Sequence, residues 1–256
     1  MPFVKPGNRL YHYCKLETAR DFILPSHNLL LNSIIKTNDP RENVDFVFRS
    51  TSIGMSHDDI QKNLKEVSRI LRENCKVLCF AQDYNDKWGC ASSPMWAHYG
   101  GNHTGVCLEL DKIEFMKENP KIDWNLFKQI NYFDFKIPTI NDPPSSNPFG
   151  HRHIDLTIAD KIGLGNYVHN TVKQKHLDYF YYSKNREWEY EREIRLVHFG
   201  DDTKQEFCSI KKSLANIHLG ICFDDKQIPT LKSQVAGVDF YKLKYGDISL
   251  YSEQLP

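Results

Sequence analysis

The chain turns from charged residues into an apolar strand within Trp188-Glu189-Tyr190-Glu191-Arg192-Glu193-Ile194-Arg195-Leu196-Val197-His198-Phe199. Apolar residues alternate from Ile194 onward, and this period of two predicts a strand that begins near Glu193. Glu191 and Glu193 would repel each other at the mouth of that strand unless cations or a ligand offset the repulsion. The stretch is therefore a candidate site. A solvated, salt-bridged edge strand is the alternative interpretation.

Length and composition favour a soluble globular protein. A chain of 256 residues can bury one sizeable core, so we expect a single domain over 1–256. Thirty-three basic and 33 acidic residues cancel, which argues against a surface devoted to nucleic acid or to anionic membrane. The first residues lack the apolar region of a signal peptide, and no apolar run has the length of a membrane helix. We expect a cytoplasmic protein with no membrane partner.

The cysteines and histidines do not form a metal-binding pattern. Seven cysteines are scattered without a C-x-x-C pair, as in proteins with reduced, mostly buried thiols. Eleven histidines are many, but none is accompanied by a paired cysteine framework. We expect no metal.

Hydrophobic periodicity predicts strands and helices in mixed order. The expected strands cover residues 9–14, 29–31, 77–80, 106–110, 193–199, 207–210, 217–223 and 238–243, the last being the final strand. The expected helices cover 16–24, ending at Pro25, a long segment that starts after Ser56, and 227–235. A Pro-rich surface excursion followed by a helical pattern predicts an insertion at about 134–186.

Two further segments carry candidate binding residues. His12 and Tyr13 lie in the first strand, and a turn rich in capping residues follows at Asn38-Asp39-Pro40. Trp96 and Tyr99 precede paired glycines and would share one face of a short helix, which makes a flat aromatic platform.

Each of these residues has a structural alternative. His12 could be a strand histidine bonded to the backbone, and the two aromatic residues could belong to the core. The Asn38-Asp39-Pro40 turn is most simply a cap. Arg195 could clamp an anion such as a pyrophosphate, or pair with Glu193 on one strand face.

The segments LYHYC, LNSIIKTNDPRE, MWAHYGGNHTGVCLEL and WEYEREIRL together resemble the bacterial family known as domain of unknown function 2971. The shared features are the Y-x-Y strand, the N-D-P turn, the W-x-x-Y segment with H-x-G, and the E-x-E-x-R strand. The resemblance runs from about Tyr11 to Phe223. The family label itself implies no activity.

A more distant resemblance is to ADP-ribosyltransferase-like toxins, which use a His-Tyr-Glu or Arg-Ser-Glu triad. It implies an α+β fold with a split mixed β-sheet core, flanking helices and a helical insertion. It also implies NAD as substrate and two catalytic carboxylates. By this resemblance Glu193 holds the ribose hydroxyl and stabilises the oxocarbenium-like transition state, and Glu191 orients the substrate. The middle segment departs from the Arg-type pattern, because it lacks Ser-Thr-Ser.

The resemblance also implies a set of NAD-binding residues. His12 would bond the nicotinamide ribose and Tyr99 would stack on nicotinamide. The full binding set is His12, Tyr13, Asn38, Asp39, Trp96, Tyr99 and Arg195. The chemistry of the reaction is consistent with these roles. Cleaving the bond to nicotinamide develops positive charge on the ribose, and a nearby carboxylate stabilises that charge more in the transition state than in the ground state.

Three functional hypotheses follow. The first is an NAD-dependent ADP-ribosyltransferase or NAD glycohydrolase, acting as a toxin or antiphage effector on nucleic acid or protein, with a cognate antitoxin or defence-system partner. The second is a metal-dependent nuclease, with acidic ligands at Asp39, Glu109, Asp111 and Glu193. The third is a non-catalytic module that senses a nucleotide or binds a partner.

Overall fold

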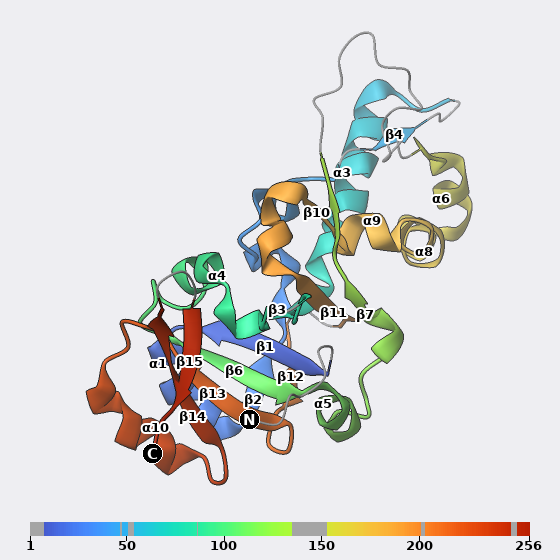
Figure 1. Ribbon diagram of the computed structural model, residues 1–256. Helices are drawn as coiled ribbons and strands as arrows, with labels where there is room; N and C mark the ends of the chain where they lie inside the picture. Colours follow the sequence, from blue (N-terminus) through green and yellow to red (C-terminus); the bar gives the residue numbers. More distant parts are fainter. Residues whose placement is uncertain are drawn as a thin grey trace.

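A large mixed β-sheet forms the centre of the computed structural model, which describes residues 8–46, 48–50, 54–85, 87–134, 153–200, 203–246 and 250–256. The strand order is β15-β14-β13-β6-β1-β5-β11-β7, and β3 also pairs with β5. All neighbours are antiparallel except β13 and β14 (Figure 1). The strands are β1 Arg9–Cys14, β3 Asn32–Ser33, β5 Cys75–Ala81, β6 Val106–Asp111, β7 Phe127–Gln129, β11 Glu193–Phe199, β13 Leu214–Leu219, β14 Asp239–Tyr245 and β15 Leu250–Gln254. The α+β class expected from the sequence is confirmed.

Short strand pairs and helices surround this sheet. The pairs are β2 Asn28–Leu30 with β12 Phe207–Ser209, β8 Asn131–Phe133 with β10 Ser183–Asn185, and β4 Arg49–Ser50 with β9 His153–Ile154. The α-helices are α1 Leu16–Thr18, α2 Leu24–Ser26, α3 His57–Glu73, α4 Ser93–His98, α5 Lys112–Glu118, α6 Leu156–Ile162, α7 Leu164–Tyr167, α8 Lys173–Lys175, α9 Leu177–Tyr181 and α10 Ile228–Gln234. The π-helical turns are η1 Ala19–Ile23 and η6 Val168–Val172. The 3-10 helices are η2 Ile34–Lys36, η3 Pro40–Asn43, η4 Gly89–Ala91, η5 Trp124–Leu126, η7 Arg186–Glu191 and η8 Asp225–Gln227.

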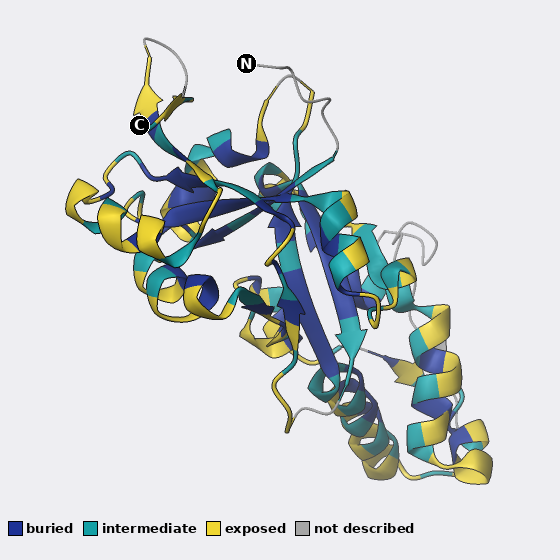
Figure 2. Ribbon diagram, turned by 90° about the horizontal axis from the view of Figure 1, so that it is seen from below, coloured by how far each residue is buried: buried dark blue, intermediate teal, exposed yellow. Residues whose placement is uncertain are grey.

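Strands β5 and β11 separate two apolar cores. Successive side chains of a strand point to opposite faces, so Leu78 and Phe80 enter one core while Val77 enters the other. The first core lies against β1, β6 and β13, and the second contains Val67 of α3 and Val168 of η6. Figure 2 shows the buried strands at the centre and exposed helix faces around them.

The helices that follow the Pro-rich stretch pack with α3. Ser56 caps α3 by accepting a hydrogen bond from the Asp59 amide, as the sequence predicts. Most of the Pro-rich stretch, residues 135–152, lies outside the described residues. The single-domain organisation and the insertion at about 134–186 stay predictions.

Three expected boundaries are wrong. The strand expected over 217–223 ends at Leu219, because the chain turns at Ile221 and Cys222. The first helix does not end at Pro25 but continues through α2 to Ser26, because Pro25 lies in the first turn of α2, directly after the π-helical turn η1, where proline is tolerated. It ends at His27, which has a left-handed conformation. β14 is not the final strand, because β15 follows and pairs with it antiparallel. The short, partly polar sequence LYSEQ gave no clear strand pattern.

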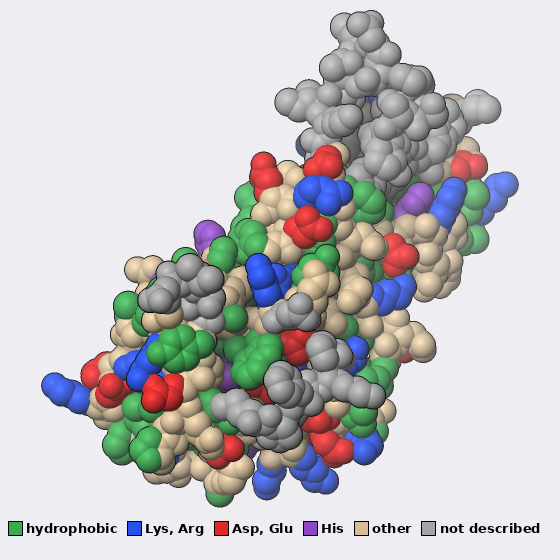
Figure 3. All heavy atoms as spheres, in the orientation of Figure 1, with side chains coloured by type: hydrophobic (Ala, Val, Ile, Leu, Met, Phe, Trp, Pro, Cys, Tyr) green, Lys and Arg blue, Asp and Glu red, His purple; other side chains and the backbone are tan. Residues whose placement is uncertain are grey.

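Two surface properties bear on possible partners. None of the helices in the described ranges is long and apolar enough to cross a membrane. Basic and acidic side chains are interspersed over the described part of the face in Figure 3, consistent with the balanced charge of the chain.

The backbone pairing between β1 and β5 is interrupted. β1 pairs with β6 along its whole length, and β5 does the same with β11. Between β1 and β5, however, the described register contains only the pair Tyr11 and Ala81. Beyond this pair the two strands separate, and the side chains of His12 and Cys79 lie at the opening.

Gly220 offers a test of the loop packing beside β13. A Cβ atom added there would overlap the backbone carbonyl oxygen of His103, so the backbone would have to move. We expect Gly220→Ala to lower the free energy of unfolding in urea by about 1–3 kcal/mol. Gly165 in α7 has open space around its Cα, and Gly165→Ala should be neutral or stabilising by about 0.5–1 kcal/mol. An equal change in unfolding free energy for the two substitutions would contradict the close contact between Gly220 and the His103 carbonyl oxygen.

Candidate functional site

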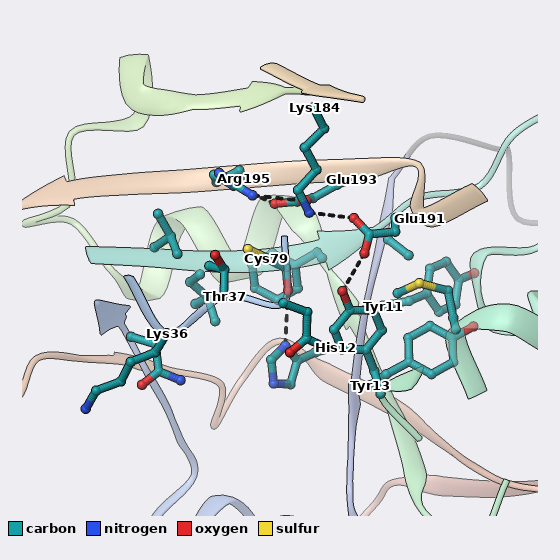
Figure 4. A pocket seen from close by; sticks show the side chains of 18 of the residues that line it. Tyr11, His12, Tyr13, Lys36, Thr37, Cys79, Lys184, Glu191, Glu193 and Arg195 are labelled. Atoms are coloured by element: carbon teal, nitrogen blue, oxygen red, sulfur yellow. Dashed lines mark hydrogen bonds and ion pairs between the residues drawn. The ribbon is translucent and has the colours of Figure 1, made fainter. Parts of the chain in front are cut away.

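A cavity of about 270 Å³ occupies the opening between β1 and β5 (Figure 4). Its walls come from β1, β5, the segment after η2, α4 with the residue that follows it, and the η7–β11 junction. Seven of the nine site residues expected from the sequence line it. They are His12, Tyr13, Asn38, Tyr99, Glu191, Glu193 and Arg195.

The other two expected residues, Trp96 and Asp39, are buried beside the cavity. Trp96 donates a hydrogen bond from Nε1 to the Cys90 carbonyl oxygen at 2.8 Å and packs edge-on against Tyr13. It is a core aromatic residue in this structure. Asp39 caps η3 by accepting from the Arg41 amide at 2.9 Å, and burial raises the pKa of its carboxyl. The turn-cap interpretation therefore describes this residue.

Arg195 is held by two carboxylates in a fully buried position. Its Nε donates to Oε1 of Glu193 at 2.6 Å, and its Nη2 donates to Oε2 of the same residue at 3.2 Å. Nη1 donates to Glu42 of η3 and to the Tyr181 carbonyl oxygen. Arg195 is thus engaged on both sides by protein groups.

Lys184 of β10 joins the two glutamates of the E-x-E pattern. Its Nζ lies 2.6 Å from Oε2 of Glu191 and 2.6 Å from Oε2 of Glu193. The hydroxyl of Tyr99 donates to Oε1 of Glu191 at 2.5 Å. The described residues of this charged cluster are Glu42, Lys184, Glu191, Glu193 and Arg195, so it contains three carboxylates and two cations.

The excess carboxylate of the cluster is Glu191. Burial acts to raise the pKa of Glu193, but Arg195 and Lys184 outweigh it and hold that pKa well below its usual range. Burial raises the pKa of Glu191, although Lys184 opposes the rise. The surroundings therefore give the two glutamates different proton affinities, and the pKa of Glu191 is the higher of the two.

His12 is held as a neutral imidazole. Burial lowers its pKa, and its Nδ1 lies 3.1 Å from the Cys79 carbonyl oxygen, to which it must donate. The proton on Nδ1 leaves Nε2 as an acceptor. His12 can therefore accept a hydrogen bond from a hydroxyl group in the cavity.

Sequence reasoning missed three charged residues of this region. Glu42 and Lys184 complete the buried cluster, and Lys36 lines the cavity. Only Glu42 could have been noticed in the sequence, because it lies two residues after the Asn38-Asp39-Pro40 turn.

The acidic residues of the nuclease hypothesis are engaged by protein groups, and Arg9 pairs with both Glu109 and Asp111. Glu109 lies 2.8 Å from Nε2 of His218, and Asp111 caps α5. Within the part of the chain that the structure describes, no group of three or more His, Cys, Asp or Glu residues could hold a metal ion.

Removing the buried guanidinium tests the cluster. Arg195→Met leaves Glu193 and Glu42 without their main partner, so the free energy of unfolding should fall by about 3–5 kcal/mol. Arg186 pairs with Asp134 and Glu189 on the surface, and Arg186→Met should change stability little. An equal loss of unfolding free energy in both variants would show that the buried ion pairs stabilise the fold no more than the surface ion pairs do.

The depressed pKa of Glu193 predicts a pH dependence of stability. A carboxyl whose pKa is lower in the folded state contributes its full stabilisation above its unfolded value of 4.5 and loses it as the pH falls toward the folded value. Wild type should therefore lose unfolding free energy as the pH is lowered below about 4.5, and Glu193→Gln should lose less. The unfolding free energy of each protein is measured in urea at a series of pH values. The same dependence on pH in wild type and Glu193→Gln would show that the pKa of Glu193 is not depressed in the folded state.

Comparisons with known proteins bear on one part of the chain. A family model described as protein of unknown function (DUF2971) matches residues 95–196. No curated protein and no solved structure gave a match. The matched segment contains Tyr99, Lys184, Glu191, Glu193 and Arg195, whereas His12 lies outside it. Over this segment the chain is similar to that family, which supports the resemblance expected from the sequence.

Proposed function

We propose that this protein cleaves the bond between nicotinamide and ribose in NAD, as an ADP-ribosyltransferase or an NAD glycohydrolase, with Glu191 as the carboxylate next to the reacting sugar. One observation carries the proposal. Glu191 lines the cavity as the excess carboxylate of the buried cluster, and Tyr99 and His12 line the same cavity.

The reaction requires a negative charge near the sugar. The C1′–N bond breaks with its electron pair moving to the nicotinamide nitrogen, which neutralises the pyridinium and leaves positive charge on the ribose ring. A hydroxyl or amine of the acceptor, or water, then attacks C1′ and loses a proton. A fixed carboxylate stabilises the charged ribose more than the ground state, and this difference lowers the barrier.

The geometry favours Glu191 over Glu193 for this role. Both carboxylate oxygens of Glu193 are engaged by Arg195 and Lys184. Glu191 is held by Lys184 and by the Tyr99 hydroxyl, a group that can exchange its bond for one to a ligand. We therefore give Glu193 the role of fixing the two cations, whereas the resemblance to ADP-ribosyltransferases implied a catalytic role for both glutamates.

The remaining walls suit a nicotinamide riboside. Nε2 of His12 is an acceptor for a ribose hydroxyl, and an aromatic ring such as Tyr99 adds about 0.5–1.5 kcal/mol when it stacks on a planar group. The cavity of about 270 Å³ lies just below the range of about 300–1,000 Å³ common for ligand pockets. A part of NAD the size of a nucleoside fits that volume better than the whole dinucleotide.

The opening between β1 and β5 also supports the proposed ADP-ribosyltransferase-like split sheet. A role as a toxin or antiphage effector, with nucleic acid or protein as acceptor, belongs to the same proposal.

Nicotinamide release from NAD tests the proposal. Glu191→Gln keeps the shape of the side chain but removes its charge, so the rate should fall by about 100-fold or more. Glu187→Gln, on the exposed face of the same 3-10 helix, is the matched control and should keep the wild-type rate.

Three outcomes would count against the proposal. They are absence of release from wild type, full activity in Glu191→Gln, and magnesium-dependent cleavage of nucleic acid in place of release, which would favour the nuclease hypothesis. Circular dichroism and urea unfolding of each variant separate loss of chemistry from loss of fold.

A further inference from the structure

We infer that the end of this cavity formed by Lys36, Thr37 and Asn38 is a phosphate site, in which Lys36 binds the 5′-phosphate of the nicotinamide nucleotide. The identity of the ligand rests on the proposed function. The inference adds a residue that determines specificity for a phosphorylated ligand, and it orients that ligand in the cavity.

Lys36 reaches the cavity because of its place in the fold. It is the last residue of η2, which follows β3, and β3 pairs with β5 at the cavity wall. Its side chain is exposed, and Figure 4 shows it at the end of the cavity opposite to Glu191. Its neighbours in the lining at this end are the neutral polar residues Thr37, Asn38 and Asn32. Thr37 donates its hydroxyl hydrogen to the Ile34 carbonyl oxygen, whereas the side-chain amide groups of Asn38 and Asn32 can donate to phosphate oxygens.

Lys36 is the cation that the described lining leaves available to a ligand. Lys184 is paired with Glu191 and Glu193, and Arg195 is paired with Glu193 and Glu42. No carboxylate of the described residues lies within ion-pair distance of Lys36. An ammonium group without a protein partner at a cavity mouth can bind phosphate as a point charge.

The charge distribution along the cavity sets the direction of the ligand. The inner end carries the excess negative charge of Glu191, and the outer end carries the positive charge of Lys36. A nicotinamide mononucleotide has a positive pyridinium at one end and a negative phosphate at the other. With the ring inside and the phosphate at Lys36, both ends meet opposite charge, whereas the reverse orientation would place like charges together at both ends. The adenylate half of NAD would then leave the cavity past Lys36.

Two probes that differ only in the phosphate test this inference. Dissociation constants of nicotinamide mononucleotide and nicotinamide riboside are measured by calorimetry for wild type, Lys36→Met and Lys211→Met. Lys211 is exposed and lies outside the cavity, so it controls for the loss of one surface charge. Wild type and Lys211→Met should bind the mononucleotide about tenfold or more tightly than the riboside. Lys36→Met should bind the two equally, with unchanged affinity for the riboside.

The outcomes separate this inference from the proposed function. A preference for the mononucleotide that persists in Lys36→Met, or no preference in wild type, overturns the phosphate site even when nicotinamide release depends on Glu191. A Lys36-dependent preference without any nicotinamide release supports the phosphate site and overturns only the proposed reaction. If neither probe binds to wild type, both proposals fail.

Discussion

The ion pair between Arg195 and Glu193 is the constraint on which the rest of the site depends. A fully buried guanidinium is tolerated only when carboxylates and carbonyl groups satisfy its donors, and here Glu193, Glu42 and Tyr181 do so. The bond from Arg195 to Glu42 ties β11 to η3, although the two segments are distant in sequence. Lys184 then pairs with Oε2 of Glu193 and with Oε2 of Glu191, so the two glutamates share this cation. The cluster therefore contains one carboxylate more than its cations, because Glu191 and Glu193 share Lys184.

The interrupted pairing of β1 and β5 opens a cavity beside this cluster, so that a ligand can reach it. Each strand is fully paired on its other side, so separating the two leaves the sheet intact while it opens a hollow at its centre. Two apolar cores on either side of β5 and β11 hold the opening in place. Strand β1 contributes His12 from one wall, and the η7–β11 junction contributes Glu191 from the other. This arrangement is compatible with a ligand that enters edge-on between the strands.

Local patterns predicted the elements better than the site. The strands expected at 9–14 and from about Glu193 onward match β1 and β11, in which most side chains are buried. Trp96 and Tyr99 were expected on one face of a helical turn, but α4 ends at His98, so Tyr99 follows the helix and lines the cavity while Trp96 is buried. The pairing of Arg195 with Glu193 was one of two open interpretations. Contacts such as Lys184 with Glu193 depend on how strands meet in space, which no local pattern encodes.

The most direct measurement is a crystal structure of the Glu191→Gln variant soaked with nicotinamide mononucleotide. We predict electron density between β1 and β5, with the pyridinium ring beside Tyr99, a ribose hydroxyl on Nε2 of His12, and the phosphate at Lys36. Density with the phosphate beside residue 191, density outside this cavity, or an empty cavity at saturating ligand would contradict it.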